Sequence, residues 1–480
     1  KNRYSAIVKS GRLLKIKLGD FTPSISPYTI KGKRMRGMGI DLRLGWIRFQ
    51  LLDGELERAV QGLYDIDQSY TVSKVNIDET GNTVYELDRH GYTFRNDINT
   101  YRLALNIKDK IIFGTTLMKI KNDYKSVEKE LADARFTVSS DTTIELGNQI
   151  NSGTYTFSEF QESINTAEYS YQLVEKGWGG RKPQENIVIG TDFKLLLNRQ
   201  KFLLEGFFAL SLVNKDIWDG SLSLAELDEM GGDVADGKIM GEIDTLGLPN
   251  PESIEEYITI NLNLVPLIPI DFNLFKTDPT KAVRNMPATA YNLKLRLLYF
   301  NNFFEIQYLQ VGPEFTSLAN PYFPKNIREI SIMDKIWFLN RRLQTSINYK
   351  TKTNDILETN SNPYYENNFG INLNYIPGVN LPSVIYGHQR INRTNPNASL
   401  DTLSTTIDSS LPEPETTYII QDLRVDLLRI NNFFTVNMPL NLKGGSYWIA
   451  GTFNSIVNTD QLENERPDTL FISQASTMRL

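Results

Sequence analysis

The connections between the alternating segments of this chain follow a regular order, short and then long. Each short break joins two long alternating segments, as a tight hairpin turn does. The short breaks lie at residues 44–45, 108–110, 198–200, 301–302, 340–342 and 431–432. The long polar connections between them cover residues 61–90, 124–184, 216–255, 314–326, 354–366 and 393–414. Because a soluble sandwich or propeller mixes its loop lengths, this order favours a membrane β-barrel, which has short turns at one rim and long loops at the other.

The segments between the breaks have a period of two residues, which is typical of strands. In NLKLRLLY, residues 292–299, Leu293 and Leu295 alternate with polar residues. The chain offers about 16 to 20 such strands, many of them about 10 to 14 residues long. A tilted membrane strand needs about 9 to 11 residues, whereas the usual strand has about 5 or 6. The least regular of the expected strands lie in residues 256–275 and 433–457.

Helix signals are few. Residues 126–136, SVEKELADARF, begin with Ser126, a residue type that caps helices, and carry Glu128 in the first turn. Residues 223–230, SLAELDEM, form a second short candidate. The sequence is therefore predicted to be all-β.

The strand and turn patterns predict a transmembrane antiparallel up-and-down β-barrel of about 16 to 20 strands in the bacterial outer membrane. The short turns would be periplasmic and the long loops extracellular. One barrel domain covers residues 1–480, with long loops at 124–184 and 216–255. A further strand is expected before Lys1, because a periplasmic turn in the hairpin 3–20 makes the chain enter from outside. The alternative is a large soluble antiparallel β-protein, whose strands also alternate.

In the barrel interpretation, polar residues in mid-strand line the lumen, where they are either simply solvated or set the selectivity of a pore. The connection 124–184 is the candidate for a constriction loop folded into that lumen. The expected pore-lining residues are Arg43, Arg48, Gln50, Arg102, Lys194, Glu205, Lys294, Arg296, Glu305, Gln307, Arg342, Gln344 and Asn348.

Aromatic residues gather beside the short breaks, as in LLYFNNFFEI (297–306) and LLRINNFFTV (427–436). An aromatic girdle at the periplasmic interface explains this placement. The girdle is predicted to contain Trp46, Phe300, Phe303, Phe304, Trp337, Phe338, Phe433 and Phe434. One residue does not fit, because Asp334 is in phase with Ile332 and would point at lipid unless a β-bulge intervenes.

Several function classes are excluded or disfavoured. The chain has no cysteine and only 2 histidines, so disulfides and thiolate sites are excluded, and a transition-metal site and catalysis are not expected. The formal net charge of −6 gives no basic footprint for nucleic acid. The acidic stretch 226–244 has the ligand type that Ca²⁺ prefers, but its spacing matches no EF-hand, and a solvated loop is the better interpretation. No cofactor, metal or enzymatic activity is expected.

Residues 19–44, GDFTPSISPYTIKGKRMRGMGIDLRL, resemble a recurring element of outer-membrane barrels, in which Gly-Asp ends one strand and Arg-Gly opens the next. Usher-type secretion barrels show a similar layout, matched here by Gly19, Asp20, Arg36 and Gly37, although the plug and chaperone-binding domains of ushers are not evident. The wider pattern, including 311–323 and 331–349, resembles large uncharacterised barrels of Bacteroidota and Chlorobi-type bacteria. The resemblance implies an outer-membrane location and a role in transport or secretion.

Two functions follow from these patterns. The first is a porin-like channel for passive passage of small solutes, in contact with outer-membrane lipid and lipopolysaccharide. The second is a plugged barrel that serves as a scaffold or secretion-associated platform for surface lipoproteins or other outer-membrane partners. Conductance distinguishes them, since only the channel conducts ions after reconstitution.

Overall fold

The structure is a computed structural model, and most of the chain is described. The described residues are 4–60, 70–77, 83–89, 93–127, 135–138, 142–144, 148–165, 171–175, 182–218, 220–229, 238–239, 243–244, 250–266, 272–320, 322–357, 363–378, 380–395, 401–406, 416–421, 424–443, 445–462 and 473–479.

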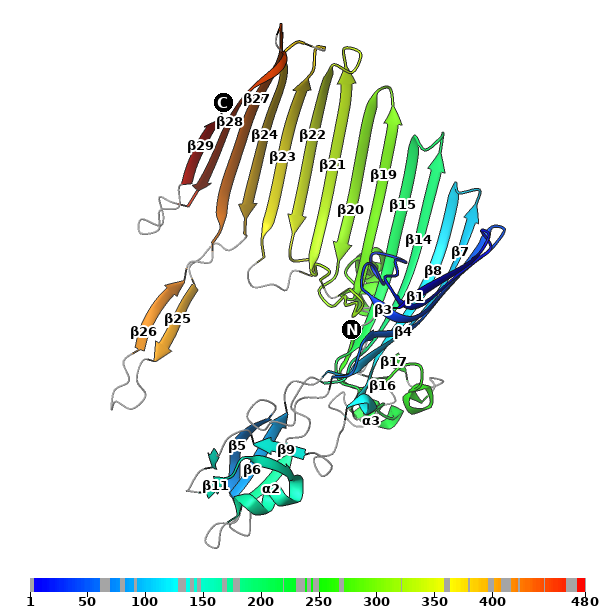
Figure 1. The fold of residues 1–480 in the computed structure, drawn as a ribbon, viewed down its shortest axis with the longest axis vertical. Coiled ribbons are helices and arrows are strands. Elements are labelled where there is room, and N and C mark those ends of the chain that lie inside the picture. Colours follow the sequence, from blue (N-terminus) through cyan, green and yellow to red (C-terminus); the bar gives the residue numbers. More distant parts are fainter. Residues whose placement is uncertain are drawn as a thin grey trace.

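One large antiparallel sheet dominates the fold, and strands that follow each other along the chain are neighbours in it (Figure 1). Of its 18 strands, 17 form an up-and-down meander, and the two-residue strand β18 (Leu264–Val265) pairs beside them with β15. The meander consists of β1 (Ser5–Ser10), β2 (Leu14–Phe21), β3 (Met35–Leu44), β4 (Ile47–Glu57), β7 (Arg95–Ile107), β8 (Ile111–Asp123), β14 (Glu185–Leu197), β15 (Phe202–Asn214), β19 (Thr289–Tyr299), β20 (Asn302–Val311), β21 (Ile327–Phe338), β22 (Leu343–Thr353), β23 (Tyr365–Tyr375), β24 (Ser383–Thr394), β27 (Asp426–Leu442), β28 (Gly445–Asp460) and β29 (Ser473–Arg479). The predicted all-β, up-and-down architecture is confirmed.

The sheet is strongly curved, and Figure 1 shows β1 to β4 turned in front of the strands that follow them. Among the described residues, the two end strands β1 and β29 are not paired with each other. No helix in the described part of the chain is long and apolar enough to cross a membrane.

The alternation of short and long connections is confirmed for most of the sheet. Tight turns join β7 to β8, β14 to β15, β19 to β20 and β21 to β22. Several turn residues adopt the left-handed conformation, for example Phe300 at φ 51° and Asn301 at φ 55°. We call the rim with these turns the short-turn end and the opposite rim the long-loop end.

The turn predicted at 431–432 is wrong. Both asparagines lie inside β27, where Asn431 pairs with Gln389 and Asn432 with His388 of β24. The strand runs on to Leu442, and the turn to β28 follows there. The strand boundaries predicted at 430 and 433 are therefore corrected, and every second connection is again short.

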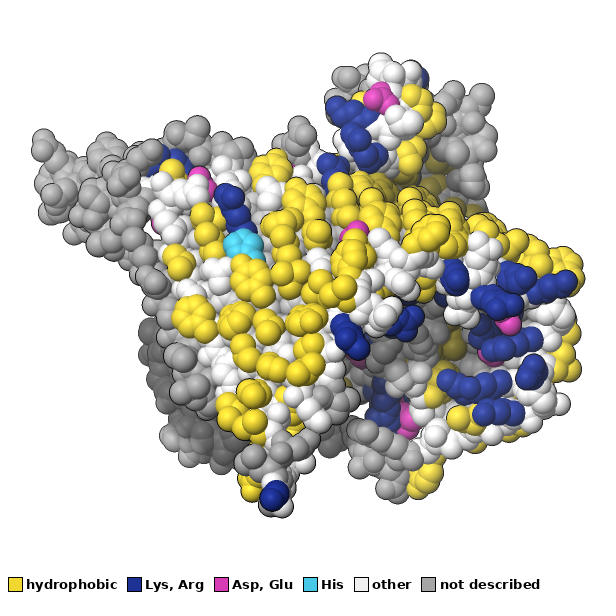
Figure 2. All heavy atoms as spheres, turned by 90° about the horizontal axis from the view of Figure 1, so that it is seen from above, with side chains coloured by type: hydrophobic (Ala, Val, Ile, Leu, Met, Phe, Trp, Pro, Cys, Tyr) yellow, Lys and Arg dark blue, Asp and Glu magenta, His cyan; other side chains and the backbone are white. Residues whose placement is uncertain are grey.

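Alternate residues divide the sheet into two faces. On β7, Leu103 is 54% exposed whereas its neighbour Arg102 is 8% exposed. We call the face that carries Arg102 the inner face and the face that carries Leu103 the outer face. Large hydrophobic side chains are exposed along the outer face, and Figure 2 shows how they spread over its surface.

Outside the large sheet, short elements fill the long connections. The predicted helix at 223–230 is confirmed as α3 (Leu224–Glu229), with Ser223 accepting a hydrogen bond from the Glu226 backbone. The helix predicted at 126–136 is wrong at both described ends: a 3-10 turn (Tyr124–Ser126) stops at Ser126, and β9 (Arg135–Val138) is a strand. Residues 128–134 lie outside the described part.

The two strands predicted in 256–275 are wrong in the parts that the structure describes, 256–266 and 272–275, where the short β18 (Leu264–Val265) is the strand found. Residues 256–263 are irregular, and α4 (Phe272–Thr277) is followed by α5 (Pro279–Arg284). The remaining short elements are β5 (Tyr70–Ile77), β6 (Thr83–Arg89), β10 (Thr142–Ile144), β11 (Asn148–Ile150), β12 (Gly153–Thr156), α2 (Phe157–Ile164), β13 (Tyr171–Glu175), β16 (Lys238–Ile239), β17 (Ile243–Asp244), the 3-10 turn Pro251–Ile254, β25 (Asp401–Thr406) and β26 (Thr416–Gln421).

Candidate functional site: the inner face and two loops packed against it

Polar residues form continuous rows across the inner face. Residues that are directly paired in antiparallel strands project to the same face. By this rule Lys15 of β2, Asp41 of β3, Gln50 of β4 and Arg102 of β7 form one row. Four adjacent strands thus present hydrogen-bonding groups to the same space.

Ion pairs connect side chains of neighbouring rows on the inner face. The Arg48 guanidinium donates two hydrogen bonds to Asp41, with Nε–Oδ1 and Nη2–Oδ2 distances of 2.8 and 2.7 Å. Arg43 lies 3.5 Å from the same carboxylate. Such two-pronged guanidinium–carboxylate contacts fix both position and angle.

Lysine–glutamate pairs continue the pattern along the sheet. Lys294 of β19 lies 3.1 Å from Glu305 of β20, and Lys350 of β22 lies 2.8 Å from Glu329 of β21. The strand register places all of the predicted pore-lining residues on the inner face except Arg342, which lies in the turn between β21 and β22. Whether they line a water-filled pore stays a prediction.

The predicted aromatic girdle is divided between the two faces. Phe304, Phe338 and Phe434 project to the outer face. Phe303, Trp337 and Phe433 pair with residues of the inner face and so project to it. Phe300, 99% exposed, and Trp46 lie in turns. The predicted position beside a short turn is wrong for Phe433 and Phe434, because both lie inside β27. Phe303 and Trp337 project away from the outer surface. Whether the remaining aromatic residues form an interfacial girdle stays a prediction.

Asp334 and His388 are polar residues that project to the outer face. Asp334 pairs with Phe304 and Ile347 without a register shift, so no bulge turns it inward, and its Oδ1 has no hydrogen-bond partner. His388 projects to the same face, and its Nδ1 lies 2.7 Å from Asn432 Oδ1. His90 is outside the described residues, and within them no three His, Asp or Glu side chains are grouped to hold a metal ion.

The Gly-Asp and Arg-Gly pairs of 19–44 meet across β2 and β3. Gly19 is directly opposite Gly37, and Asp20 is opposite Arg36, with 3.4 Å between carboxylate and guanidinium. Gly19 has φ +86°, and a Cβ there would lie 2.2 Å from the Tyr4 carbonyl oxygen, so only glycine fits. The residues that carried the resemblance therefore form one structural unit.

Two loops fold onto the inner face near the long-loop end. We call residues 22–34, between β2 and β3, the first inner loop, and residues 312–326, between β20 and β21, the second inner loop. Tyr28 of the first loop is 2% exposed and stacks on Phe207 of β15 at 4.4 Å between ring centroids. Phe323 of the second loop packs on Tyr28 at 4.9 Å. Burial raises the pKa of the Tyr28 phenol above its ordinary value.

Hydrogen bonds join the inner loops to each other and to the sheet. The Ser317 hydroxyl donates to the Thr29 carbonyl at 2.8 Å, and Lys33 donates to the Leu318 carbonyl at 3.2 Å. On β14, the buried Asn186 amide donates to the Thr316 carbonyl and accepts from the Leu318 backbone, both at 3.1 Å. Each loop is therefore held by both apolar packing and specific polar contacts.

The sequence prediction placed the inward loop elsewhere. The described parts of 124–184 lie beyond the long-loop ends of the strands in Figure 1, with α2 and β9 among them. The signal for the true inner loops is present in the sequence, because the second contains Phe315, Leu318, Ala319 and Phe323 within a connection classed as polar. These apolar side chains pack in the cluster around Tyr28 and Ile30.

No protein-family model and no curated protein matches this sequence. Among solved structures, the chain is similar to the siderophore receptor PiuA from Acinetobacter baumannii, with 11% identity and a TM-score of 0.26, over 99% of this chain and 77% of the receptor. It is also similar to the siderophore receptor PirA from the same species, with 8% identity and a TM-score of 0.26, over 95% of this chain and 61% of the receptor. A third match is the Escherichia coli P pilus tip assembly intermediate PapC-PapD-PapK-PapG, with 8% identity and a TM-score of 0.24, over 100% of this chain and 57% of the matched chain. These are distant likenesses to outer-membrane proteins, and TM-scores this low carry no weight for function.

Proposed function

We propose that this chain forms a β-barrel in the bacterial outer membrane and passes small solutes, with the two inner loops narrowing its long-loop mouth. The observation that carries the proposal is the opposite character of the two faces over long strands. The outer face exposes side chains such as Leu103, Phe113 and Leu293, while the inner face carries paired charges. Water inside and hydrocarbon outside satisfy both faces at once.

The backbone supports the same interpretation. In hydrocarbon every N–H and C=O group must be hydrogen-bonded within the protein, and an antiparallel ladder closed on itself achieves this. The meander supplies the ladder from β1 through β29, and the proposal requires the edges of these two end strands, which are not paired with each other among the described residues, to be closed. In this proposal lipid covers the outer face, lipopolysaccharide lies at the long-loop rim, and no catalytic step is involved.

A second candidate is favoured by the inner loops themselves. If they close the lumen, the barrel serves as a scaffold for surface lipoproteins or other partners. The contacts of Tyr28 and Asn186 give the loops a fixed position, as a plug needs.

Two measurements test these functions in order. A folded barrel in detergent is expected to migrate faster on an SDS gel before boiling than after it. A chain that remains in solution without detergent and shows no such shift contradicts the barrel. Planar-bilayer conductance then distinguishes the pore, which gives discrete current steps, from the scaffold, which gives none.

A further inference from the structure

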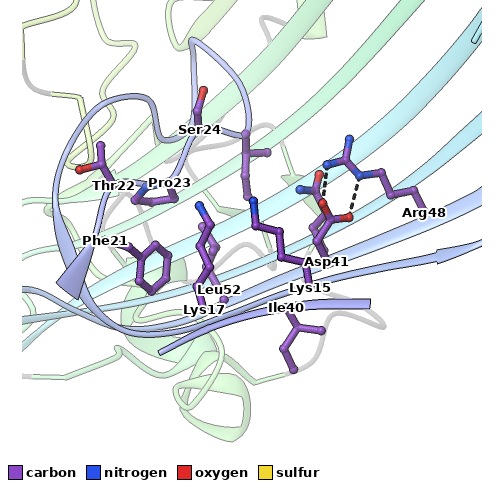
Figure 3. Close-up of a pocket in the computed structure, with 13 residues that line it drawn as sticks. Lys15, Lys17, Phe21, Thr22, Pro23, Ser24, Ile40, Asp41, Arg48 and Leu52 are labelled. Carbon is purple, nitrogen blue, oxygen red and sulfur yellow. Dashed lines mark hydrogen bonds and ion pairs between the residues drawn. The ribbon is translucent and has the colours of Figure 1, made fainter. Parts of the chain in front are cut away.

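A pocket opens on the inner face between the start of the first inner loop and strands β2 to β4 (Figure 3). Its volume is about 220 Å³. Its polar lining includes Lys15 and Lys17 of β2, Arg48 and Gln50 of β4, and Thr22 and Ser24 of the loop. A space of this size suits a small solute or a single charged group of a larger one.

Positive charge predominates in this pocket. Asp41 is its carboxylate, and it already accepts two hydrogen bonds from Arg48. Among the described residues, no carboxylate lies within ion-pair distance of Lys15 or Lys17. Lys17 Nζ lies over the Phe21 ring in a cation–π contact, 5.4 Å from the ring centroid. Asp41 is directly opposite Lys15 in the register and attracts Lys17, but it is shared with Arg48 and Arg43, so the two ammonium groups face the pocket without a direct ion pair and positive charge is in excess.

The strand register concentrates this charge. Lys15 and Lys17 are two residues apart on β2 and so share the inner face, and Lys9 of β1 is directly opposite Lys15. Like charges placed directly opposite each other destabilise a sheet. Figure 3 shows the amines of Lys15 and Lys17 directed toward the loop that carries Thr22 and Ser24. Elsewhere on this face, the lysines at 294 and 350 each lie beside a glutamate.

We propose that this pocket binds a small anion with a carboxylate or phosphate group, and that such anions are the solute class of the barrel. This assignment rests on the proposed function. The two lysines supply charge-assisted hydrogen bonds, and the Gln50 amide, which also lines the pocket, supplies a neutral donor. The Arg48–Asp41 pair holds the guanidinium at the pocket wall.

The decisive experiment is equilibrium dialysis of inorganic phosphate, and separately of succinate, against the detergent-folded chain. The double variant Lys15→Gln/Lys17→Gln is expected to bind at least about tenfold more weakly than the unaltered chain, because both ammonium partners are lost. Lys15→Arg/Lys17→Arg keeps the charge and is expected to retain most of the binding. Faster migration before boiling shows that each variant is folded.

The matched control is Lys350→Gln/Lys352→Gln, which also removes two charges, two residues apart on one strand of the same face, where Lys350 lies 2.8 Å from Glu329. Unchanged affinity in this variant supports a local site. An equal loss in both variants, or no saturable binding by the folded, unaltered chain, overturns the inference. Binding of succinate but not phosphate, or the reverse, names the group that the pocket prefers.

Conductance measurements separate the proposal that the chain forms a pore from the proposal that the pocket binds anions. Current steps with no block by phosphate and no loss of anion preference in the double variant would leave the pore in place and overturn the assigned solute class. Saturable phosphate binding by a chain that never conducts would overturn the pore and leave a binding pocket. If phosphate blocks the current, and this block weakens in the Lys15→Gln/Lys17→Gln variant but not in the control variant, the pore and its assigned solute class are both supported.

Discussion

The guanidinium of Arg102 on β7 reaches across β8 to Asp192 on β14 and binds both of its carboxylate oxygens, with 2.9 Å between Nη2 and Oδ2. The intervening strand permits this contact because it has glycine at position 114. A Cβ at Gly114 would lie 2.5 Å from Arg102 Nη2. One ion pair thus links three consecutive strands of the inner face.

Asp192→Asn is expected to lower stability, because it leaves the buried Arg102 charge without its partner. Breaking a fully buried ion pair in this way costs about 3–5 kcal/mol, and this pair, in which Asp192 is 22% exposed, should cost about 2–3 kcal/mol. The readout is the temperature at which the unboiled, fast-migrating band is lost. The control is Glu205→Gln, which breaks the exposed pair with Lys194 at 3.9 Å and should cost about 1 kcal/mol or less. Equal shifts in the two variants would contradict a special role for the Arg102 pair.

Tyr28→Ala is expected to free the first inner loop from the sheet. The substitution removes the stack on Phe207 and the contact with Phe323, and large-to-small changes at buried aromatic positions cost about 3–5 kcal/mol. Single-channel current should rise, and backbone amides of residues 22–34 should exchange faster with solvent.

Tyr322→Ala is the matched control for this change. It removes the same side chain from the second inner loop at a position that is 94% exposed, so current and amide exchange should stay unchanged. If Tyr28→Ala speeds amide exchange but leaves the current as it was, the inner loops do not set the width of the pore.

The sequence was sufficient to predict the strands of the sheet and which residues form its polar face, because a period of two residues is a local property of each strand. The sequence prediction failed where pairing with a neighbouring strand decides whether a residue is extended or lies in a turn. At the NN of 301–302, Asn301 forms the turn together with Phe300, and both have positive φ. The NN of 431–432 stays extended, because β24 pairs with both residues. Asparagine favours turns only weakly against such pairing. The inner loops were missed for the same reason, since Ser317 and Thr29 meet across 288 residues of sequence.

The corrected register makes a prediction for two adjacent positions. The chain has no cysteine, so Phe433→Cys and Phe434→Cys each introduce a single thiol. In reconstituted vesicles, a water-soluble maleimide is expected to label position 433 at least about tenfold faster than 434, because the thiol must ionise in water to react. The same order is expected for Phe303→Cys over Phe304→Cys. The reverse order at 433 and 434 would mean that β27 is shifted by one residue, which exchanges the two faces.

Acidification is expected to hold the second inner loop more tightly against the sheet. Burial raises the pKa of Glu314 above its ordinary value of 4.5, and the nearby Lys215 charge offsets part of this effect. A carboxyl whose pKa is higher in the packed loop than in the free loop favours packing when it is protonated. That contribution is fully present below about pH 4.5 and is lost as the pH rises through the raised pKa.

Single-channel current should therefore fall, and amide exchange in residues 312–326 should slow, as the pH is lowered from 7 toward 4.5. Glu314→Gln provides the comparison, because it keeps the shape and removes the titrating proton. Burial and the Lys215 charge lower the pKa of Lys325 in the same loop, and Lys325 is present in both proteins, so the difference between their pH profiles isolates Glu314. Identical profiles would show that this carboxyl does not control the loop, and a rise in current on acidification of the unaltered chain alone would reverse the sign of the coupling.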